Sequence, residues 1–315
     1  MYLTPLIKET FLKLFSIFPS FRKRLSLYRK YKSYPHVPGH YYSLIPDLSD
    51  VELRKEKIFY NDDIKDINLR LEEQFRFLNE IKEYYKHIPY TFSEKLPGGN
   101  SKYRYDARND YYRYGDAIFL FCMMLHLKPA RIVEVGSGYS SAMMLDTNEN
   151  FLQNSTHLTL IEPYPEERLF SLLTEKDKKT TTVLKSFVQD TPPEIYRSLE
   201  ANDILFIDSS HVSKPGSDVN FIVFNILPLL KPGVVIHFHD IFYPFELPST
   251  WVLEKKWFWN ENYILRAFLM NNPDYEIVLF NNLLYKKYHS WFEKELPDAL
   301  IDWQHTGSLW IRKIR

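Results

Sequence analysis

After Pro129 the sequence alternates between short apolar runs and stretches in which apolar residues have helical spacing. The first four runs are RIVEV (131–135), HLTLIE (157–162), TTVLK (181–185) and DILFID (203–208). Strands that alternate with helices are typical of a parallel sheet covered on both faces, because each parallel connection needs a crossover. We therefore predict a doubly wound α/β fold with ligands at the carboxyl ends of its strands.

Three further strands complete the pattern. The run GVVIHFHDIF (233–242) follows a helical stretch at 218–230, and a second helical stretch follows it at 260–272. The last two strands are YEIVLF (275–280) and SLWIRK (308–313). The continuous apolar character of these runs fits strands that are buried on both faces.

The first hundred residues have a different pattern, with many charges and prolines and a tendency to form helices. Residues 67–85 carry apolar side chains at helical spacing. Pro97-Gly98-Gly99 predicts a loop, and the apolar stretch after it predicts a mostly buried helix. Asp116 is a candidate N-cap of that helix, and Pro129 lies just past its end. We expect two parts: a helical N-terminal extension or cap at residues 1–100, and a ligand-binding domain at residues 101–315.

Charge and cysteine content limit the classes of function. Forty basic residues balance forty acidic ones, so the chain has no net field that would attract nucleic acid. Cys122 is the single cysteine, which excludes an intrachain disulfide and fits a cytoplasmic protein. The sequence contains no apolar run long enough for a transmembrane segment. We expect a small-molecule substrate, no nucleic-acid partner and no membrane span, and a homo-oligomer is compatible with the sequence.

Several chemically active residues follow the strands. Gly136 and Gly138 in EVGSGYSS predict a tight turn that a ligand can approach without meeting a Cβ atom. Glu162 ends the next strand, where a carboxylate can accept hydrogen bonds from both ribose hydroxyls of a nucleoside. The nucleotide could be NAD or S-adenosylmethionine. The NAD pattern requires a third glycine where this chain has Ser141, and Glu134 points to a ligand with a charged amino-acid group.

At this point the chain resembles the class I S-adenosylmethionine-dependent methyltransferases over about residues 112–315. Their acidic residue followed by G-x-G matches EVGSG, their ribose-binding acid matches Glu162, and their reversed final strand pair matches 275–280 and 308–313. Ser140 departs from the pattern, since many members have glycine there. The resemblance implies a Rossmann-like, mostly parallel seven-stranded sheet with a reversed last strand. It also implies that S-adenosylmethionine is bound by these residues: Glu134, Gly136, Ser137, Gly138, Ser141, Glu162 and Asp208.

Within that class, residues 204–246 resemble a bacterial subgroup of unsettled substrate that is similar to catechol-type and macrolide-sugar O-methyltransferases. Those enzymes place a metal-binding acid after the fourth strand and an acidic pair, or Asp-Asn, after the fifth. Asp208 matches the first position, and His239 and Asp240 match the pair. Histidine at an oxygen-ligand position is a departure. The resemblance thus implies a divalent metal, Mg²⁺ or Mn²⁺, on Asp208, His239 and Asp240. This set could hold Mg²⁺ but suits Mn²⁺, Fe²⁺ or Zn²⁺ better.

The polar end of the 233–242 strand has three interpretations. In the first, Asp208, His239 and Asp240 bind a metal. In the second, His239 or His211 acts as a general base without a metal. In the third, the histidines are structural and only form hydrogen bonds with the neighbouring loops. Alternation along a strand places His237 and His239 on one face and Asp240 on the other. We favour function at the ligand edge, which gives His239, Asp240 and His211 as candidate catalytic residues.

The sequence therefore predicts methyl transfer from S-adenosylmethionine to an acceptor hydroxyl of a sugar or another small molecule, with or without a metal. Two aromatic segments, 103–116 and 242–259, flank the expected cleft, and in this class such segments cover the cofactor and shape the acceptor pocket. Two alternatives stay open, an NAD-dependent oxidoreductase and a non-catalytic module that binds S-adenosylmethionine.

Overall fold

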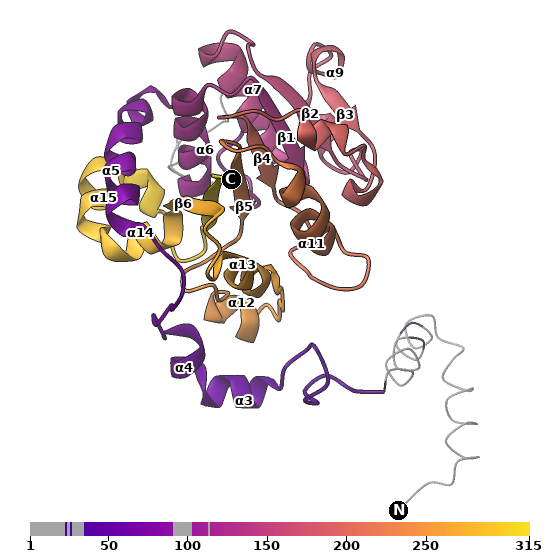
Figure 1. Ribbon diagram of the computed structural model, residues 1–315, viewed down its shortest axis with the longest axis vertical. Coiled ribbons are helices and arrows are strands. Elements are labelled where there is room, and N and C mark those ends of the chain that lie inside the picture. Colours follow the sequence, from indigo (N-terminus) through magenta and orange to yellow (C-terminus); the bar gives the residue numbers. More distant parts are fainter. Residues whose placement is uncertain (1–22, 24–25, 27–34, 91–102, 113) are drawn as a thin grey trace, which may run out of the picture.

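The computed structural model of the 315-residue chain describes residues 23, 26, 35–90, 103–112 and 114–315. The predicted loop at Pro97-Gly98-Gly99 lies outside these residues. Figure 1 shows a main body built around one sheet, with helices α3 and α4 below it.

The main body contains one seven-stranded sheet with the order β3-β2-β1-β4-β5-β7-β6. β1 to β5 pair in parallel, and β7 runs antiparallel to both β5 and β6. The prediction of a mostly parallel seven-stranded sheet with a reversed last strand is confirmed. The strands are β1 (Arg131–Val135), β2 (His157–Ile161), β3 (Thr182–Leu184), β4 (Ile204–Ile207), β5 (Val235–His239), β6 (Tyr275–Phe280) and β7 (Ser308–Lys313).

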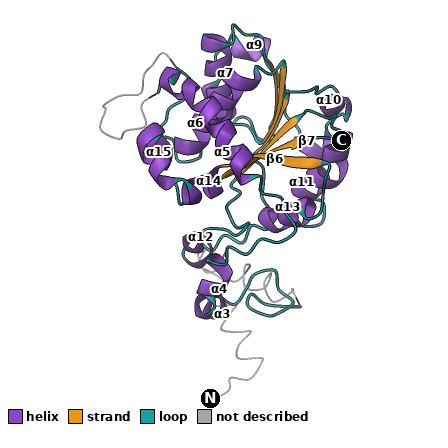
Figure 2. Ribbon diagram, turned by 60° about the vertical axis from the view of Figure 1, so that its left-hand side comes forward, coloured by secondary structure: helices purple, strands orange, loops and turns teal. Residues whose placement is uncertain are grey.

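Helices cover both faces of this sheet, as Figure 2 shows. Alternate strand residues point into two separate cores, so that Ile204 and Phe206 pack on one side and Leu205 and Ile207 on the other. The first side is covered by α5 (Leu71–Ile81), α6 (Tyr114–Leu127), α7 (Tyr139–Phe151), α14 (Asn281–Lys287) and α15 (His289–Glu295). The second is covered by α10 (Glu194–Arg197), α11 (Asp218–Phe221), the π-helix η3 (Ile222–Ile226) and α13 (Glu261–Leu269).

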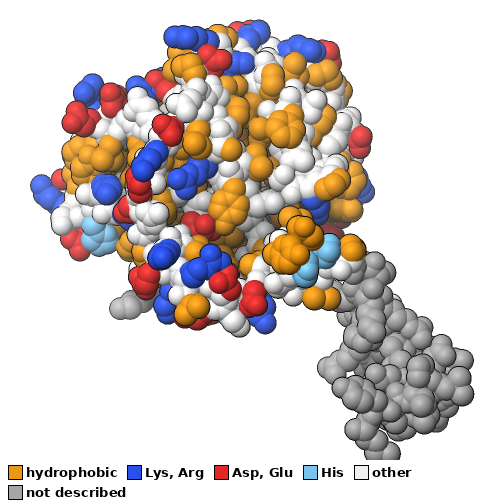
Figure 3. Space-filling view, turned by 60° about the horizontal axis from the view of Figure 1, so that its bottom comes forward, with side chains coloured by type: hydrophobic (Ala, Val, Ile, Leu, Met, Phe, Trp, Pro, Cys, Tyr) orange, Lys and Arg blue, Asp and Glu red, His pale blue; other side chains and the backbone are white. Residues whose placement is uncertain are grey.

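The remaining helices are short. They are α3 (Leu48–Leu53), α4 (Lys55–Phe59), η1 (Lys82–His87), α8 (Leu169–Leu172), α9 (Asp177–Thr180), η2 (Val188–Asp190), η4 (Leu227–Leu229), α12 (Ser249–Leu253) and η5 (Pro297–Leu300). Among all helices that the structure describes, none is both long and apolar enough to cross a membrane. Figure 3 shows basic and acidic side chains intermixed on one face of the molecule.

Helix α6 is buried almost throughout and begins two residues before the predicted N-cap. Its first residue is Tyr114, so Asp116 lies inside the first turn and not at the cap position. Gly115 allows this start, because a Cβ atom there would overlap the hydroxyl of Tyr285. The Asp116 carboxylate is buried and accepts a hydrogen bond from Asn281 Nδ2 at 3.3 Å. The N-cap prediction was therefore wrong, and Asp116 is available for another role.

The N-terminal segment contributes a helix to the same core. The pattern predicted a helix over 67–85, and the structure has α5 followed by η1. Leu78 and Ile81 of α5 are buried with α6, and Gln74 Oε1 accepts a hydrogen bond from the backbone of Phe280 at 2.7 Å. This helix therefore covers the β6 edge of the sheet, while the division of the chain at residue 100 stays a prediction.

Helices α3 and α4 pack on the segment that follows β5. Val51 of α3 and Phe59 of α4 form a small core with Phe242, Trp251 and Val252. This small core connects the N-terminal segment to the aromatic residues that follow the fifth strand.

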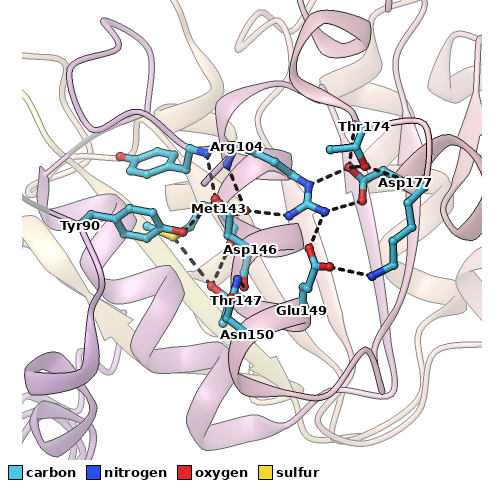
Figure 4. Close-up of polar contacts among 11 residues, drawn as sticks. Tyr90, Arg104, Met143, Asp146, Thr147, Glu149, Asn150, Thr174 and Asp177 are labelled. Atoms are coloured by element: carbon cyan, nitrogen blue, oxygen red, sulfur yellow. Dashed lines mark hydrogen bonds and ion pairs between the residues drawn. The ribbon is translucent and has the colours of Figure 1, made fainter. Parts of the chain in front are cut away.

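Arg104 joins the segment before α6 to two helices (Figure 4). Its guanidinium forms ion pairs with Asp146 and Glu149 of α7 at 2.8 and 2.6 Å and with Asp177 of α9 at 2.7 Å. The side chains of Asp146 and Asp177 are buried, and only 9% of the Arg104 side chain is exposed. The backbone of Tyr105 also donates to Asp146 at 2.9 Å. This network fixes the chain that leads to the tyrosines at 111 and 112.

We predict that Arg104→Met lowers the free energy of unfolding by about 3–5 kcal/mol, because it leaves buried carboxylates without their cation. Urea unfolding followed by circular dichroism measures the change. Arg108→Met is the matched control, since the Arg108 side chain is exposed and pairs with the half-exposed side chain of Asp106. An Arg104 variant as stable as the control would show that the network adds no stability.

Candidate active site

The glycine turn after β1 has one strict requirement, at Gly136. This residue has φ of +84°, and a Cβ atom there would lie 1.8 Å from the carbonyl oxygen of Asp208. Its amide donates to the carbonyl of Ile161 at 3.0 Å. Glycine therefore lets the turn lie directly against the end of β4. Gly138 has an extended backbone and precedes the first turn of α7.

Glu134 lies beneath this turn with no exposed surface. Its carboxylate accepts hydrogen bonds from the hydroxyls of Ser140, at 2.6 Å, and Ser141. Burial raises the pKa of Glu134 to about 7, against the opposing effect of the serine hydroxyls. Glu134 and Ser141 thus bind the first turn of α7 to β1, and Ser141 also accepts from the amide of Gly138 at 2.9 Å. Their predicted role in cofactor binding stays a prediction.

Glu162 lies at the β2 end of the same edge. Its Oε2 accepts from the amide of Ser137 at 3.2 Å, and its Oε1 accepts from the amide of Tyr164 at 2.9 Å. Glu162, Gly136 and Asp208 line a cavity of about 440 Å³. The structure therefore brings these three predicted residues together around a space that a nucleoside can enter.

Gln189 and Phe187 also line this cavity, and sequence reasoning missed both. Gln189 Nε2 donates to the carbonyl of Gly216 at 2.8 Å. Its Oε1 is shielded from solvent and has no hydrogen-bond partner among the described residues. The Phe187 ring is 51% exposed and lines the same space. An unpaired amide oxygen beside an aromatic face fits a purine that carries an amino group.

His211 lies between carboxylates from three segments. Its Nδ1 lies 2.8 Å from Glu261 Oε2, and its Nε2 lies 3.4 Å from Asp208 Oδ1 and 3.8 Å from Asp240 Oδ2. Burial opposes the charged imidazolium, but these carboxylates outweigh it and hold the pKa of His211 well above its ordinary value. The Trp259 ring covers the imidazole, with 4.6 Å between ring centres. Both ring nitrogens of His211 therefore face carboxylates.

Asp240 turns toward the same cluster in a way that strand alternation did not predict. β5 continues through His239, and Asp240 then adopts a left-handed backbone with φ of +55°. Its Oδ1 consequently lies 3.6 Å from His239 Nε2. Burial lowers the pKa of His239, but Asp240, Asp208 and Asp116 raise it more, and the result is a raised pKa. The two residues thus share one edge of the sheet.

His237 belongs to the core. Its imidazole stacks on Phe206 with 3.9 Å between ring centres and meets Trp310 edge-on. Neither ring nitrogen has a hydrogen-bond partner among the described residues. Burial holds its pKa well below the ordinary value, so the ring is neutral.

A second cavity, of about 390 Å³, opens beyond the cluster. His239, Asp240 and Asp116 line it on one side, and Trp251 and Trp257 line it on another. Burial raises the pKa of Asp116 to about 6, while the nearby His239 opposes the shift. The apolar helix α6 thus places the carboxyl group of Asp116 in this cavity.

The predicted metal ligands do not form a coordination set. Within the described part of the chain, no three His, Cys, Asp or Glu side chains are arranged to hold a metal ion. The imidazole of His211 instead lies between Asp208 and Asp240, where a cation shared by the two would be expected. As arranged, these residues fit a histidine–carboxylate network and not a metal. A metal requirement stays a prediction.

Comparison with known proteins places these motifs in a family. Residues 133–241 match the family described as a methyltransferase domain. An uncharacterized protein of Archaeoglobus fulgidus is 34% identical over 171 residues, which are 53% of this chain and 75% of that protein.

Three solved structures are similar to the chain at low scores. The S-adenosylhomocysteine-bound methyltransferase PaMTH1 of Podospora anserina is 16% identical, with 85% of this chain and 95% of that chain covered and a TM-score of 0.41. The O-methyltransferase TomG of Streptomyces achromogenes is 14% identical, with 85% of this chain and 96% of that chain covered and a TM-score of 0.40. A putative caffeoyl-CoA O-methyltransferase of Staphylococcus aureus is 15% identical, with 85% of this chain and 100% of that chain covered and a TM-score of 0.41. The family assignment does not depend on these three.

The family is given by the methyltransferase-domain match together with the fold. The domain match begins at Val133, within β1, and ends at Ile241, just past β5, so it contains Gly136, Glu162 and Asp208. Because it spans the strand-end motifs, and because the sheet has the predicted seven strands with a reversed last strand, the chain belongs to the class I S-adenosylmethionine-dependent methyltransferases.

Proposed function

We propose that the protein transfers the methyl group of S-adenosylmethionine to a hydroxyl group of a small-molecule acceptor. The observation that carries this proposal is the position of the His211–Asp208–Asp240 cluster. Asp208 lines the 440 Å³ cavity, Asp240 lines the 390 Å³ cavity, and His211 contacts both carboxylates. A methyl donor in the first cavity and an acceptor in the second would therefore meet at this cluster.

The first cavity has the donors and acceptors that the adenosine part of the cofactor requires. Glu162 would accept hydrogen bonds from the ribose hydroxyls, and Gln189 Oε1 would accept one from the adenine amino group. Phe187 would cover a face of the base. S-adenosylmethionine supplies a methyl group on a positively charged sulfur.

His239 is the better candidate for the base. It lines the 390 Å³ cavity, whereas His211 lies under Trp259 and faces carboxylates with both of its ring nitrogens. A base must be neutral before it can take the proton of an acceptor hydroxyl. Asp240 and Asp116 would then stabilise the imidazolium that forms on His239. His211 would position Asp208 and Asp240.

We predict that Glu162→Gln weakens S-adenosylhomocysteine binding at least tenfold, since hydrogen bonds to a charged group contribute about 1.5–3 kcal/mol. Isothermal titration calorimetry measures the affinity. Glu166→Gln is the matched control, because Glu166 lies in the same loop, is exposed and pairs with Lys185. Equal affinities of the two variants would exclude Glu162 as a ribose ligand.

We predict that His239→Gln lowers kcat by a factor of about 10²–10⁴ while the affinity for S-adenosylhomocysteine stays unchanged, because a general base acts only on the acceptor. Release of S-adenosylhomocysteine with a panel of hydroxylated acceptors provides the assay. His126→Gln, on α6, is the control. If chelator abolishes turnover and Mn²⁺ restores it, the metal role is right and the base role is wrong. Tight cofactor binding without turnover of any acceptor would favour the non-catalytic module.

We predict that the turnover rate rises with pH through the pKa of His239, which lies above its ordinary value of about 6.5. Asp240 is the strongest of the carboxylates that raise this pKa. Asp240→Asn should therefore move the rising limb of the pH–rate profile to lower pH. The profile of kcat against pH checks this, and a limb that stays in place or moves to higher pH would contradict it.

A further inference from the structure

Arg168 lies above the glycine turn in a position that the proposed function has not yet used. It precedes α8, and its guanidinium carbon lies 3.7 Å from the centre of the Tyr111 ring. Tyr111 in turn stacks with Tyr139, the first residue of α7, at 6.0 Å and an interplanar angle of 11°. Side chains from three separate segments therefore hold this cation at the start of α7.

The Arg168 side chain also lies close to the turn itself. A Cβ atom on Gly138 would lie 3.2 Å from Arg168 Cδ and 3.3 Å from Nη1, so glycine at this position leaves room for the arginine. Arg168 is half-buried, and among the described residues no carboxylate forms an ion pair with it. Its charge is nevertheless near enough to Asp208 to contribute to lowering the pKa of that residue.

In the proposed function, on which this inference rests, Gln189 and Glu162 would hold the adenosine, and the sulfur must lie near Asp208 and Asp240 to reach the acceptor. The amino-acid end of the cofactor then continues away from Gln189, along the glycine turn at 136–138. Its carboxylate would arrive at the first turn of α7, beside Arg168.

We propose that Arg168 binds the α-carboxylate of S-adenosylmethionine and so distinguishes the complete cofactor from its adenosine fragment. A guanidinium offers two parallel N–H donors that match a carboxylate. The free amides at the start of the 13-residue helix α7 favour an anion at the same place. The Tyr111 ring holds the guanidinium beside the glycine turn before the ligand binds.

Two ligands test this assignment by calorimetry: S-adenosylhomocysteine, which has the carboxylate, and 5′-methylthioadenosine, which lacks the whole amino-acid group. Arg168→Met should weaken the first at least tenfold, as expected for the loss of a charge-assisted hydrogen bond, and leave the second within about twofold. Arg168→Lys keeps the charge but loses the two parallel N–H donors. Its affinity for S-adenosylhomocysteine should therefore lie between those of the wild type and Arg168→Met. Arg197→Met, at an exposed ion pair with Glu194, is the matched control.

The outcomes separate the two proposals. Glu162→Gln should weaken both ligands, because both contain the ribose. If Arg168→Met weakens both ligands equally, or weakens neither, the carboxylate assignment is wrong while the proposed function stands. If the wild-type protein binds neither ligand, the proposed function itself is wrong. Unfolding temperatures of all variants show whether a loss of binding reflects a loss of folding.

Discussion

The backbone of Gly136 lies against the carbonyl of Asp208, and the positions of both cavities depend on this contact. A side chain at residue 136 would overlap that carbonyl, so the ends of β1 and β4 could not lie together. With glycine, Glu162 at β2 and Asp208 at β4 line one continuous space. The same contact places Asp208 where His211 reaches both it and Asp240.

The charged cluster beside this contact is preorganised at a conformational cost. His211 and Asp240 both have left-handed backbones, with φ of +58° and +55°, which residues with a Cβ atom rarely adopt. The carbonyl of His211 accepts hydrogen bonds from the amides of Asn260 and Glu261, both at 3.1 Å, and these bonds hold the turn in place. Such strain persists where surrounding contacts fix it, and it often marks functional sites.

The sequence predicted the sheet well because strand composition and crossovers are local signals. β1 and β7 have the predicted bounds, and β2 and β4 end one residue before Glu162 and Asp208. The partners of the site were harder to predict. Glu261 lies 50 residues from His211, and no pattern along the chain relates the two. Gln189 was missed because it follows a strand of only three residues. Asp116 was predicted to be a helix cap because the actual start of α6, two residues earlier, depends on the close approach of Gly115 to Tyr285.

The two cavities are built from different parts of the chain. The 440 Å³ cavity, proposed for the cofactor, comes from within residues 133–241, which match the methyltransferase domain. The 390 Å³ cavity, proposed for the acceptor, adds Asp116 from before that range and Trp251 and Trp257 from after it. Trp251 is supported in turn by Val51 and Phe59 of the N-terminal helices. The segments that flank the methyltransferase domain therefore shape the 390 Å³ cavity. If the acceptor binds there as proposed, changes in those segments would alter the acceptor while the geometry of the strand ends is kept.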